Sequence, residues 1–277
     1  MLEKIDLTKE LAKEEWKELR PALQRQLYDL ERAGFEAGMP TIIVFEGWDA
    51  AGKGTTINML TQRLDPRGFR VWPIRAARTS EQNRPWLWRF WLKLPNRGEI
   101  AILDRSWYGR VLVERVEKLI PEQEWQKAYR DIVDFEQMLA EDGHLIVKFW
   151  LHISKVEQRR RFRALEKDQL QAWHVQPEDW EHYRKYDAYL QAAEEMLERT
   201  ETEFAPWTIV EATDQRHTHW KVMSTIVEAF DRSLRARGID TASLSAEAMT
   251  AKAAAEHVKS ANQQINKSTN QQTSASC

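Results

Sequence analysis

A loop that could bind phosphate is the clearest chemical feature of this sequence. Gly47, four further residues, Gly52 and Lys53 have the spacing of a Walker A motif. The backbone N–H groups of such a loop and the start of the following helix surround phosphate oxygens, and the lysine adds a positive charge. Residues 41–45 are uncharged and all β-branched or aromatic, as in a strand buried on both faces. The sequence therefore predicts a central strand, a phosphate loop and a helix beginning near Thr55.

Two residues of this loop depart from the general pattern. Gly54 follows the lysine where a hydroxyl that meets magnesium usually stands, so the hydroxyl would come from Thr55 or Thr56 instead. Asp49 lies inside the loop, where phosphates would repel its carboxylate unless a metal cation lay between them. The same residue could instead be a turn or cap residue that binds backbone N–H groups. Both interpretations of Asp49 are open at this point.

A second acidic residue ends another apolar stretch. Residues 99–104, EIAILD, predict a buried strand whose final residue, Asp104, emerges at the phosphate site as in a Walker B motif. Arg105 follows directly, and Arg110 lies five residues further on. Either guanidinium could bind oxygens of a transferred phosphoryl group, and a salt bridge to an acid such as Glu114 is the alternative. Combined with the Walker A spacing, Asp104 predicts a magnesium site.

An arginine-rich helix is predicted after the next core strand. Ser154 is its expected N-cap, with Glu157 in the capping-box position. Its arginines are Arg159, Arg160, Arg161 and Arg163. Their spacing spreads the guanidinium groups around much of the helix, so we expect residues 154–180 to form a lid over a polyanionic substrate. The alternative is a solvated helix face whose arginines pair with Glu157 and Glu166.

The chain is long enough, at 277 residues, for one α/β domain and a tail. Residues 1–40 are expected to be a helical scaffold, in which Pro21 would produce two helices or one kinked helix. Residues 41–237 are expected to form the core. Residues 238–277 are poor in large apolar side chains and are expected to be a disordered tail.

The other core elements are predicted from apolar periodicity and turn residues. Further strands are expected at residues 69–74 and 144–153, with a last strand ending near Asp214. Helices are expected at residues 55–64, 121–141, 177–200 and 220–234, with an apolar helix face at residues 86–94.

Composition excludes several classes of partner. The net charge is −2, from 41 basic and 43 acidic residues, so any site for a polyanion must be a local patch, and no nucleic-acid partner is expected. The single cysteine, Cys277, excludes an internal disulfide and a cysteine-based zinc site, and it fits a reducing cytoplasm. The charged N-terminal residues and the lack of a long apolar run predict no membrane segment.

Four stretches together resemble the polyphosphate kinase 2 family: GWDAAGKGT, LPNRGEIAILDRSWYGRVLVERV, SKVEQRRRF and LERTETEFAPW. The resemblance covers residues 16–234. It implies an α/β P-loop kinase fold related to thymidylate kinase, with three layers, a parallel sheet flanked by helices, and a helical lid. It also implies phosphoryl transfer between inorganic polyphosphate and adenine or guanine nucleotides, with Mg²⁺ or Mn²⁺, in a homodimer or homotetramer.

The resemblance also implies roles for individual residues. Asp49 and Asp104 match the paired acids that hold the metal, and Lys53 and Arg105 match the residues that neutralise the transferred phosphoryl group. The implied phosphate- or nucleotide-binding residues are Gly47, Gly52, Gly54, Thr55, Arg110, Arg159, Arg160, Arg161 and Arg163.

The family resemblance leaves more than one candidate for the nucleotide that accepts the phosphoryl group. The segments PWLWRFW, VLVERV and DWEHYRKYDAYL look closest to members that phosphorylate AMP to ADP, while ADP to ATP is also open. In either case we expect direct in-line transfer, because positioning and charge neutralisation supply most of the catalysis. Two rivals are an ATP-dependent nucleoside monophosphate kinase and a noncatalytic P-loop nucleotide sensor.

Overall fold

The computed structural model describes residues 1–170 and 172–242. Its sheet consists of β1 Thr41–Gly47, β2 Phe69–Pro73, β3 Ile100–Asp104, β4 Leu145–His152 and β5 Trp207–Glu211. All neighbouring strands are parallel, in the order β2-β3-β1-β4-β5. The chain separates into two compact units, residues 1–233 and 234–277, and the first contains every one of these strands. The predicted tail lies outside the described residues from residue 243 onward.

Strand β1 is the centre of the sheet, as its composition predicts. It pairs with β3 on one side and with β4 on the other, with Phe45 opposite both Asp104 and Phe149. Ile42, Ile43, Val44 and Phe45 are each at most 1% exposed. Because parallel strands end at the same edge, the ends of β1 and β3 place the phosphate loop beside Asp104.

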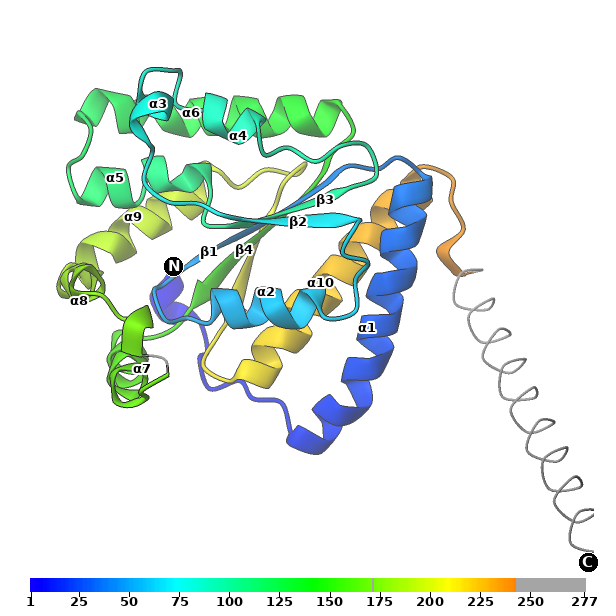
Figure 1. Ribbon diagram of the computed structural model, residues 1–277, viewed down its shortest axis with the longest axis horizontal. Coiled ribbons are helices and arrows are strands. Elements are labelled where there is room, and N and C mark those ends of the chain that lie inside the picture. Colours follow the sequence, from blue (N-terminus) through cyan, green and yellow to red (C-terminus); the bar gives the residue numbers. More distant parts are fainter. Residues whose placement is uncertain (171, 243–277) are drawn as a thin grey trace, which may run out of the picture. The chain divides into compact units, whose positions relative to one another are not determined.

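Helices cover both faces of the sheet (Figure 1). One face is covered by α1 Lys13–Glu36, α2 Lys53–Thr61 and α10 Gln215–Ala236, of which the residues up to Ser233 belong to the first unit. The other face is covered by α6 Glu122–Glu141 and α9 Tyr186–Arg199, with the short helices α3 Thr79–Gln82, α4 Trp88–Trp91 and α5 Val113–Val116. The predicted α/β class, a parallel sheet between helices, is confirmed.

Two helices, α7 Lys155–Lys167 and α8 Pro177–Arg184, lie at the end of the sheet where α2 begins (Figure 1). They occupy most of the region predicted to be a lid. Single 3-10 turns are found at Leu2–Lys4, Trp107–Arg110 and Ala172–His174. Within residues 1–170 and 172–242, no helix has the length and apolar character needed to cross a membrane.

The N-terminal scaffold is one continuous helix, so the alternative of two helices is wrong. Helix α1 Lys13–Glu36 includes Pro21 in its interior. A proline there removes one backbone hydrogen bond and crowds the preceding turn. A buried stripe on the same helix, Trp16, Leu23, Leu27 and Leu30, supplies apolar burial that offsets this cost.

The prediction of one helix over residues 177–200 is also wrong. The chain forms α8 and α9 there, separated at Lys185, whose φ and ψ are −93° and 16°. After the break, α9 packs into the core through Tyr186, Ala192, Ala193, Met196 and Leu197, whereas no residue of α8 is fully buried. The break therefore separates a helix that belongs to the core from one that lies over the phosphate loop.

Three smaller differences concern helix ends. Helix α10 begins at Gln215, earlier than the expected residue 220, and the expected helix over residues 86–94 is reduced to the single turn α4. Helix α2 starts at Lys53, before the expected residue 55. The strands and α6 lie where the sequence predicts them.

A buried ion pair joins β4 to α6 and to the segment that follows Asp104. Lys148 Nζ lies 2.8 Å from Glu136 Oε2, and both side chains are fully buried. Tyr108 donates to Glu136 Oε1 at 2.7 Å and accepts a hydrogen bond from Lys148 at 2.9 Å. Lys148 also donates to the carbonyl of Thr200 at 3.0 Å. Because these charges are paired and hydrogen-bonded, they hold the turn around Tyr108 in one position.

Candidate phosphate-binding site

The phosphate loop has a backbone conformation that few residues adopt. Gly47, Ala50 and Gly52 have φ angles of 133°, 59° and 100°, in the left-handed region that favours glycine. At Gly47 packing adds to this requirement, because a Cβ atom would lie 2.4 Å from the carbonyl oxygen of Leu151. Helix α2 begins at Lys53, so its N-terminal N–H groups lie at the loop. The predicted succession of strand, loop and helix is confirmed.

Lys53 folds back into the loop. Its Nζ donates to the carbonyl oxygens of Gly47 at 2.9 Å and Trp48 at 3.0 Å. Burial lowers the pKa of Lys53, and the nearby carboxylates, Asp49 foremost, oppose that shift. The positive charge is therefore placed under the loop before any ligand arrives.

Asp49 is bound by two side chains from other parts of the chain. Its Oδ1 accepts a hydrogen bond from Arg105 Nη2 at 2.6 Å, and its Oδ2 lies 3.2 Å from His182 Nδ1. Burial acts to raise the pKa of Asp49, but the hydrogen bond from His182 and the charges of Arg105 and Lys53 outweigh it and hold that pKa well below its usual range. The partners are thus side chains rather than the backbone N–H groups that a turn or cap residue would bind.

Asp104 is close to this group but is not tied to it. Its negative charge affects the pKa values of both Lys53 and Arg105. Its carboxylate is half-buried and has no hydrogen bond or ion pair with any residue in 1–170 or 172–242. A partly buried carboxylate without a protein hydrogen bond, which like the ionised Asp49 acts on both Lys53 and Arg105, is the kind of ligand that a hard divalent cation prefers.

Arg105 has strained backbone geometry as well as an ion pair. Its φ is 63°, which is uncommon outside glycine. Its N–H donates to the carbonyl of Phe45 at 2.9 Å, which fixes it against the end of β1. Strain of this kind is found where the surrounding structure holds a residue for function. The side chain of Arg105 is thereby directed at the loop.

Two residues of α8 join Asp49 in a group that the sequence analysis did not find. Asp49, Asp179 and His182 each offer one ligand atom, and these atoms lie within 4.8 Å of one another. Asp179 and His182 are three positions apart on one helix, a spacing that places them on the same face. That spacing was the available signal, but the partner Asp49 lies 133 positions before His182 in the sequence.

Glu46 is a second residue that the sequence analysis missed. It lies near the end of β1, is 4% exposed, and accepts a hydrogen bond from Ser106 Oγ at 2.8 Å. Burial raises the pKa of Glu46 to about 7. Ser106 Oγ also accepts from the N–H of Tyr108 at 3.2 Å, so Glu46 helps to fix the turn that follows Asp104. A charged residue inside an apolar strand was the signal for it.

Arg161 binds the protein itself rather than presenting its guanidinium to solvent. It donates to the carbonyl oxygens of Ala50 at 3.0 Å and Ala212 at 2.6 Å, and to Glu157 at 2.7 Å. Gln158, on the same helix, donates to the carbonyl of Asp49 at 3.1 Å. Helix α7 is therefore bonded directly to the phosphate loop, and each nitrogen of the Arg161 guanidinium already donates to a protein group.

The other arginines of α7 have different environments. Arg160 forms a two-bond ion pair with Glu157, as the solvated alternative expects, and its side chain is 67% exposed. Glu166 instead accepts from Trp180 Nε1. Arg159 and Arg163 are exposed, and neither makes a hydrogen bond or ion pair within the described part of the chain. Ser154 caps the helix through the N–H of Glu157, as predicted.

The remaining predicted residues face protein partners. Arg110 pairs with Glu114 at 2.7 Å and with Glu124, so the predicted alternative for Arg110 is the arrangement present. The hydroxyls of Thr55 and Thr56 both donate to the carbonyl of Gly52, at 2.9 and 2.8 Å. At Gly54 a Cβ atom would meet open space, so the loop does not need glycine there for packing.

Trp48 anchors the loop to the start of α9 and to the end of β4. Its ring stacks on Tyr186 with centroids 4.1 Å apart and an angle of 12° between the planes. Its Nε1 donates to Nδ1 of His152 at 2.9 Å. Burial lowers the pKa of His152 to about 4, so the imidazole is neutral near pH 7 and can accept this bond. Because Tyr186 directly follows the break at Lys185, the loop and the base of α8 share one anchor.

Comparison with known proteins gives a consistent result. A family model described as Polyphosphate kinase 2 matches residues 10–237. The polyphosphate:AMP phosphotransferase of Pseudomonas aeruginosa is 43% identical over 235 residues, which are 85% of this chain and 47% of that protein. The ADP-polyphosphate phosphotransferase of the same species is 42% identical over 194 residues, 70% of this chain and 64% of that protein.

A solved structure extends the likeness to the fold. The polyphosphate kinase 2 of Arthrobacter aurescens is 29% identical, with a TM-score of 0.80, and the match covers 83% of this chain and 84% of that one. The chain spans about half the length of the first curated relatives it matches.

We expect Glu46→Gln to change how stability depends on pH. The Glu46 carboxyl ionises near pH 4.5 in the unfolded chain but stays protonated up to about pH 7 in the folded protein. Because the unfolded state loses this proton first, Glu46 lowers the free energy of unfolding by about 2 to 4 kcal/mol as pH rises through this window. Urea unfolding should show the variant gaining stability relative to the parent between pH 5 and pH 8. Identical pH dependence of the two proteins would contradict the assignment.

Arg161→Ala should destabilise the fold, because the carbonyl groups of Ala50 and Ala212 lose a charged donor. The expected loss in the free energy of unfolding is about 1 to 3 kcal/mol, measured by urea denaturation. Arg163→Ala is the matched control on the same helix and should leave stability within about 0.5 kcal/mol of the parent. Equal stability of the two variants would show that Arg161 does not hold the loop.

Proposed function

The chain belongs to the polyphosphate kinase 2 family, and from this premise we propose that it is a polyphosphate-dependent nucleotide kinase. It transfers a phosphoryl group between inorganic polyphosphate and a nucleoside mono- or diphosphate. The observation that carries this proposal is the meeting of Asp49, Lys53, Asp104 and Arg105 at the carboxyl ends of β1 and β3. Phosphoryl transfer needs positioned charges of this kind and little covalent chemistry from the protein.

AMP is the acceptor that we propose first. The first relative acts, by its name, on polyphosphate and AMP, and the second on polyphosphate and ADP. The first is 43% identical over 85% of this chain, whereas the likeness to the second covers 70%. Conversion of AMP to ADP is therefore the primary proposal, conversion of ADP to ATP is the second candidate, and guanine nucleotides are further acceptors to test.

The reaction we propose is a direct in-line displacement. A phosphate oxygen of the nucleotide forms a new bond to the terminal phosphorus of polyphosphate. The bond from that phosphorus to the bridging oxygen breaks, and the shortened polyphosphate leaves with the bonding electrons. Lys53 and Arg105 neutralise the charge on the transferred group, and the N-terminal N–H groups of α2 bind phosphate oxygens.

A bound divalent metal ion is part of the proposed reaction. Asp49 and Asp104 would hold Mg²⁺, or Mn²⁺ in its place, and such an ion neutralises phosphate charge and orients the phosphate chain when bound. Arg105 is paired with Asp49 at 2.6 Å, so its guanidinium is already at the loop where phosphate oxygens would lie. His182 gives the Asp49 carboxylate a contact with α8, and Asp179 adds a third ligand atom within 4.8 Å of the other two.

The lid takes a narrower role than the sequence alone predicts. Arg159 and Arg163 are the arginines of α7 whose donors are not used by described residues, so we propose that they bind distal phosphates of the polyphosphate chain. Arg161 positions the phosphate loop, and Arg160 is paired with Glu157. Closure of α7 and α8 over the substrate would exclude water and prevent hydrolysis.

The organisation and setting of the protein remain part of the proposal. We propose a kinase core over residues 41–237, a homodimer or homotetramer, a cytoplasmic location and no nucleic-acid partner. The net charge of −2 supports the last point, and the single cysteine fits a reducing compartment.

The decisive assay omits ATP. Purified protein incubated with AMP or ADP, Mg²⁺ and long-chain polyphosphate should form ADP or ATP, quantified by chromatography. Product that appears only with ATP as donor would identify an ATP-dependent kinase, and binding without product would identify a nucleotide sensor.

Asp104→Asn should reduce turnover about tenfold or more and weaken Mn²⁺ binding measured by paramagnetic resonance, because a metal ligand loses its charge. Asp134→Asn, an exposed change on α6, is the matched control.

Removing the two arginines of α7 that lack described partners should weaken the use of polyphosphate. We expect Arg159→Ala/Arg163→Ala to raise the free-energy barrier measured by kcat/KM for polyphosphate by about 1 to 3 kcal/mol for each charged hydrogen bond removed. The effect should appear mainly in KM for polyphosphate and grow smaller with short chains. Arg20→Ala, an exposed arginine on α1, is the control. Unchanged kinetics would show that both arginines belong to a solvated helix face and do not bind polyphosphate.

A further inference from the structure

A cavity of about 550 Å³ lies at the opposite edge of the sheet from the phosphate loop. It is bordered by Pro40, which precedes β1, and by His144, which precedes β4. The loop, by contrast, follows the carboxyl end of β1. The volume falls in the range of small-molecule sites. The cavity is therefore separate from the site described above.

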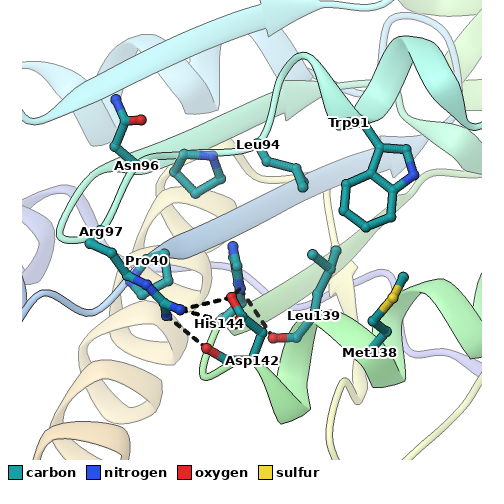
Figure 2. Close-up of a pocket in the computed structure, with 10 residues that line it drawn as sticks. Pro40, Trp91, Leu94, Asn96, Arg97, Met138, Leu139, Asp142 and His144 are labelled. Carbon is teal, nitrogen blue, oxygen red and sulfur yellow. Dashed lines mark hydrogen bonds and ion pairs between the residues drawn. The ribbon is translucent and has the colours of Figure 1, made fainter.

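The cavity offers no spare charge for a phosphate group. Its one cationic side chain, Arg97, donates to both carboxylate oxygens of Asp142, at 2.9 and 3.0 Å, and to the carbonyl of the same residue at 2.7 Å. Figure 2 shows this pair along one side of the cavity. Because the two charges offset each other and both terminal nitrogens of the guanidinium donate to Asp142, the chemistry favours an uncharged ligand.

His144 supplies one hydrogen-bond acceptor that is aimed into the cavity. Its side chain is 8% exposed, and its Nδ1 lies 3.1 Å from the carbonyl of Leu139 and 3.4 Å from Asp142 Oδ2. Both neighbours are acceptors, so Nδ1 carries the hydrogen. Burial lowers the pKa of His144, which keeps the ring neutral near pH 7. Nε2 therefore has a lone pair, and no donor from the described residues reaches it.

An indole ring provides the other half of the site. Trp91 is 45% exposed and is held edge-on by Phe135, with ring centroids 5.2 Å apart and an interplanar angle of 72°. Met138, which is 46% exposed, and Leu94 flank the cavity beside it. In Figure 2 the second nitrogen of His144 points away from Leu139, toward the side of the cavity that Leu94 borders. The indole ring and this nitrogen border the same cavity.

We propose that this cavity binds a neutral nucleobase, with the ring packed on Trp91 and an N–H group donating to Nε2 of His144. The base could arrive as a free base, as a nucleoside or as the base of a nucleotide, and these share the same recognition chemistry. A base has flat apolar faces, which Trp91, Leu94 and Met138 can accommodate. It also has an exocyclic N–H group, which can donate to Nε2 of His144. The site does not depend on the kinase activity proposed above.

Calorimetry with the full chain tests the proposal. Adenine, adenosine and AMP are titrated separately, without Mg²⁺ or polyphosphate. Adenine and adenosine should both bind, because no phosphate is needed. Trp91→Ala should weaken adenosine binding by about five- to hundredfold, the range for loss of one base–aromatic stack. Leu92→Ala, an exposed neighbour outside the cavity, is the control and should bind like the parent.

A spectroscopic arm covers the case in which a variant folds poorly. In ¹⁵N-histidine-labelled protein, adenosine should shift the Nε2 resonance that is missing from His144→Phe. Three results would overturn the proposal: no heat and no shift up to the solubility limit, binding that Trp91→Ala leaves undiminished, or binding of AMP alone, which would place the ligand at the phosphate loop. Concentration-dependent dimerisation that Trp91→Ala abolishes would likewise overturn it, because a second copy would then cover the cavity.

Discussion

The ionised carboxylate of Asp49 is the group on which the geometry of the phosphate site depends. Its side chain is 18% exposed, and each of its two oxygens is bound by a different part of the chain, Arg105 after β3 and His182 on α8. A carboxylate so placed without partners would become protonated or move into water. The interactions of this one carboxylate therefore hold the loop, the end of β3 and α8 together. To bind here, an anionic ligand must therefore replace some of the contacts that Asp49 makes with Arg105 and His182.

The same reasoning explains why neighbouring arginines on one helix have different roles. The guanidinium of Arg161 satisfies carbonyl groups of Ala50 and Ala212, which are partly buried and would otherwise lose a donor. Arg163, two positions further on, is exposed and has no described partner. A helix places residues two apart on different faces. The arginines are thus neighbours in the sequence, but their side chains lie on different faces of the helix and have different roles.

The sequence predicts the parts of this protein that local chemistry determines. Residues 41–45 are apolar enough to be buried on both faces wherever the sheet forms, and the spacing of Gly47, Gly52 and Lys53 belongs to the loop itself. The break at Lys185 is different, because the apolar stripe continues across it, and the residue that follows the break, Tyr186, stacks on Trp48, which is remote in sequence. His182 and Glu46 were missed for related reasons, since their partners are remote in sequence.

In the two proposals above, the two edges of the sheet bind different parts of a nucleotide. At the carboxyl edge, Lys53 and Arg105 are cations whose protein partners an incoming phosphate can replace. At the amino edge, Arg97 is paired with Asp142, and the described residues of the cavity lining include no further lysine or arginine, so a phosphate there would meet no excess positive charge. Strand β1 Thr41–Gly47, with 7 residues at about 3.3 Å each, separates these edges by about 20 Å. One nucleotide cannot reach across that distance, so occupation of both edges requires two ligand molecules.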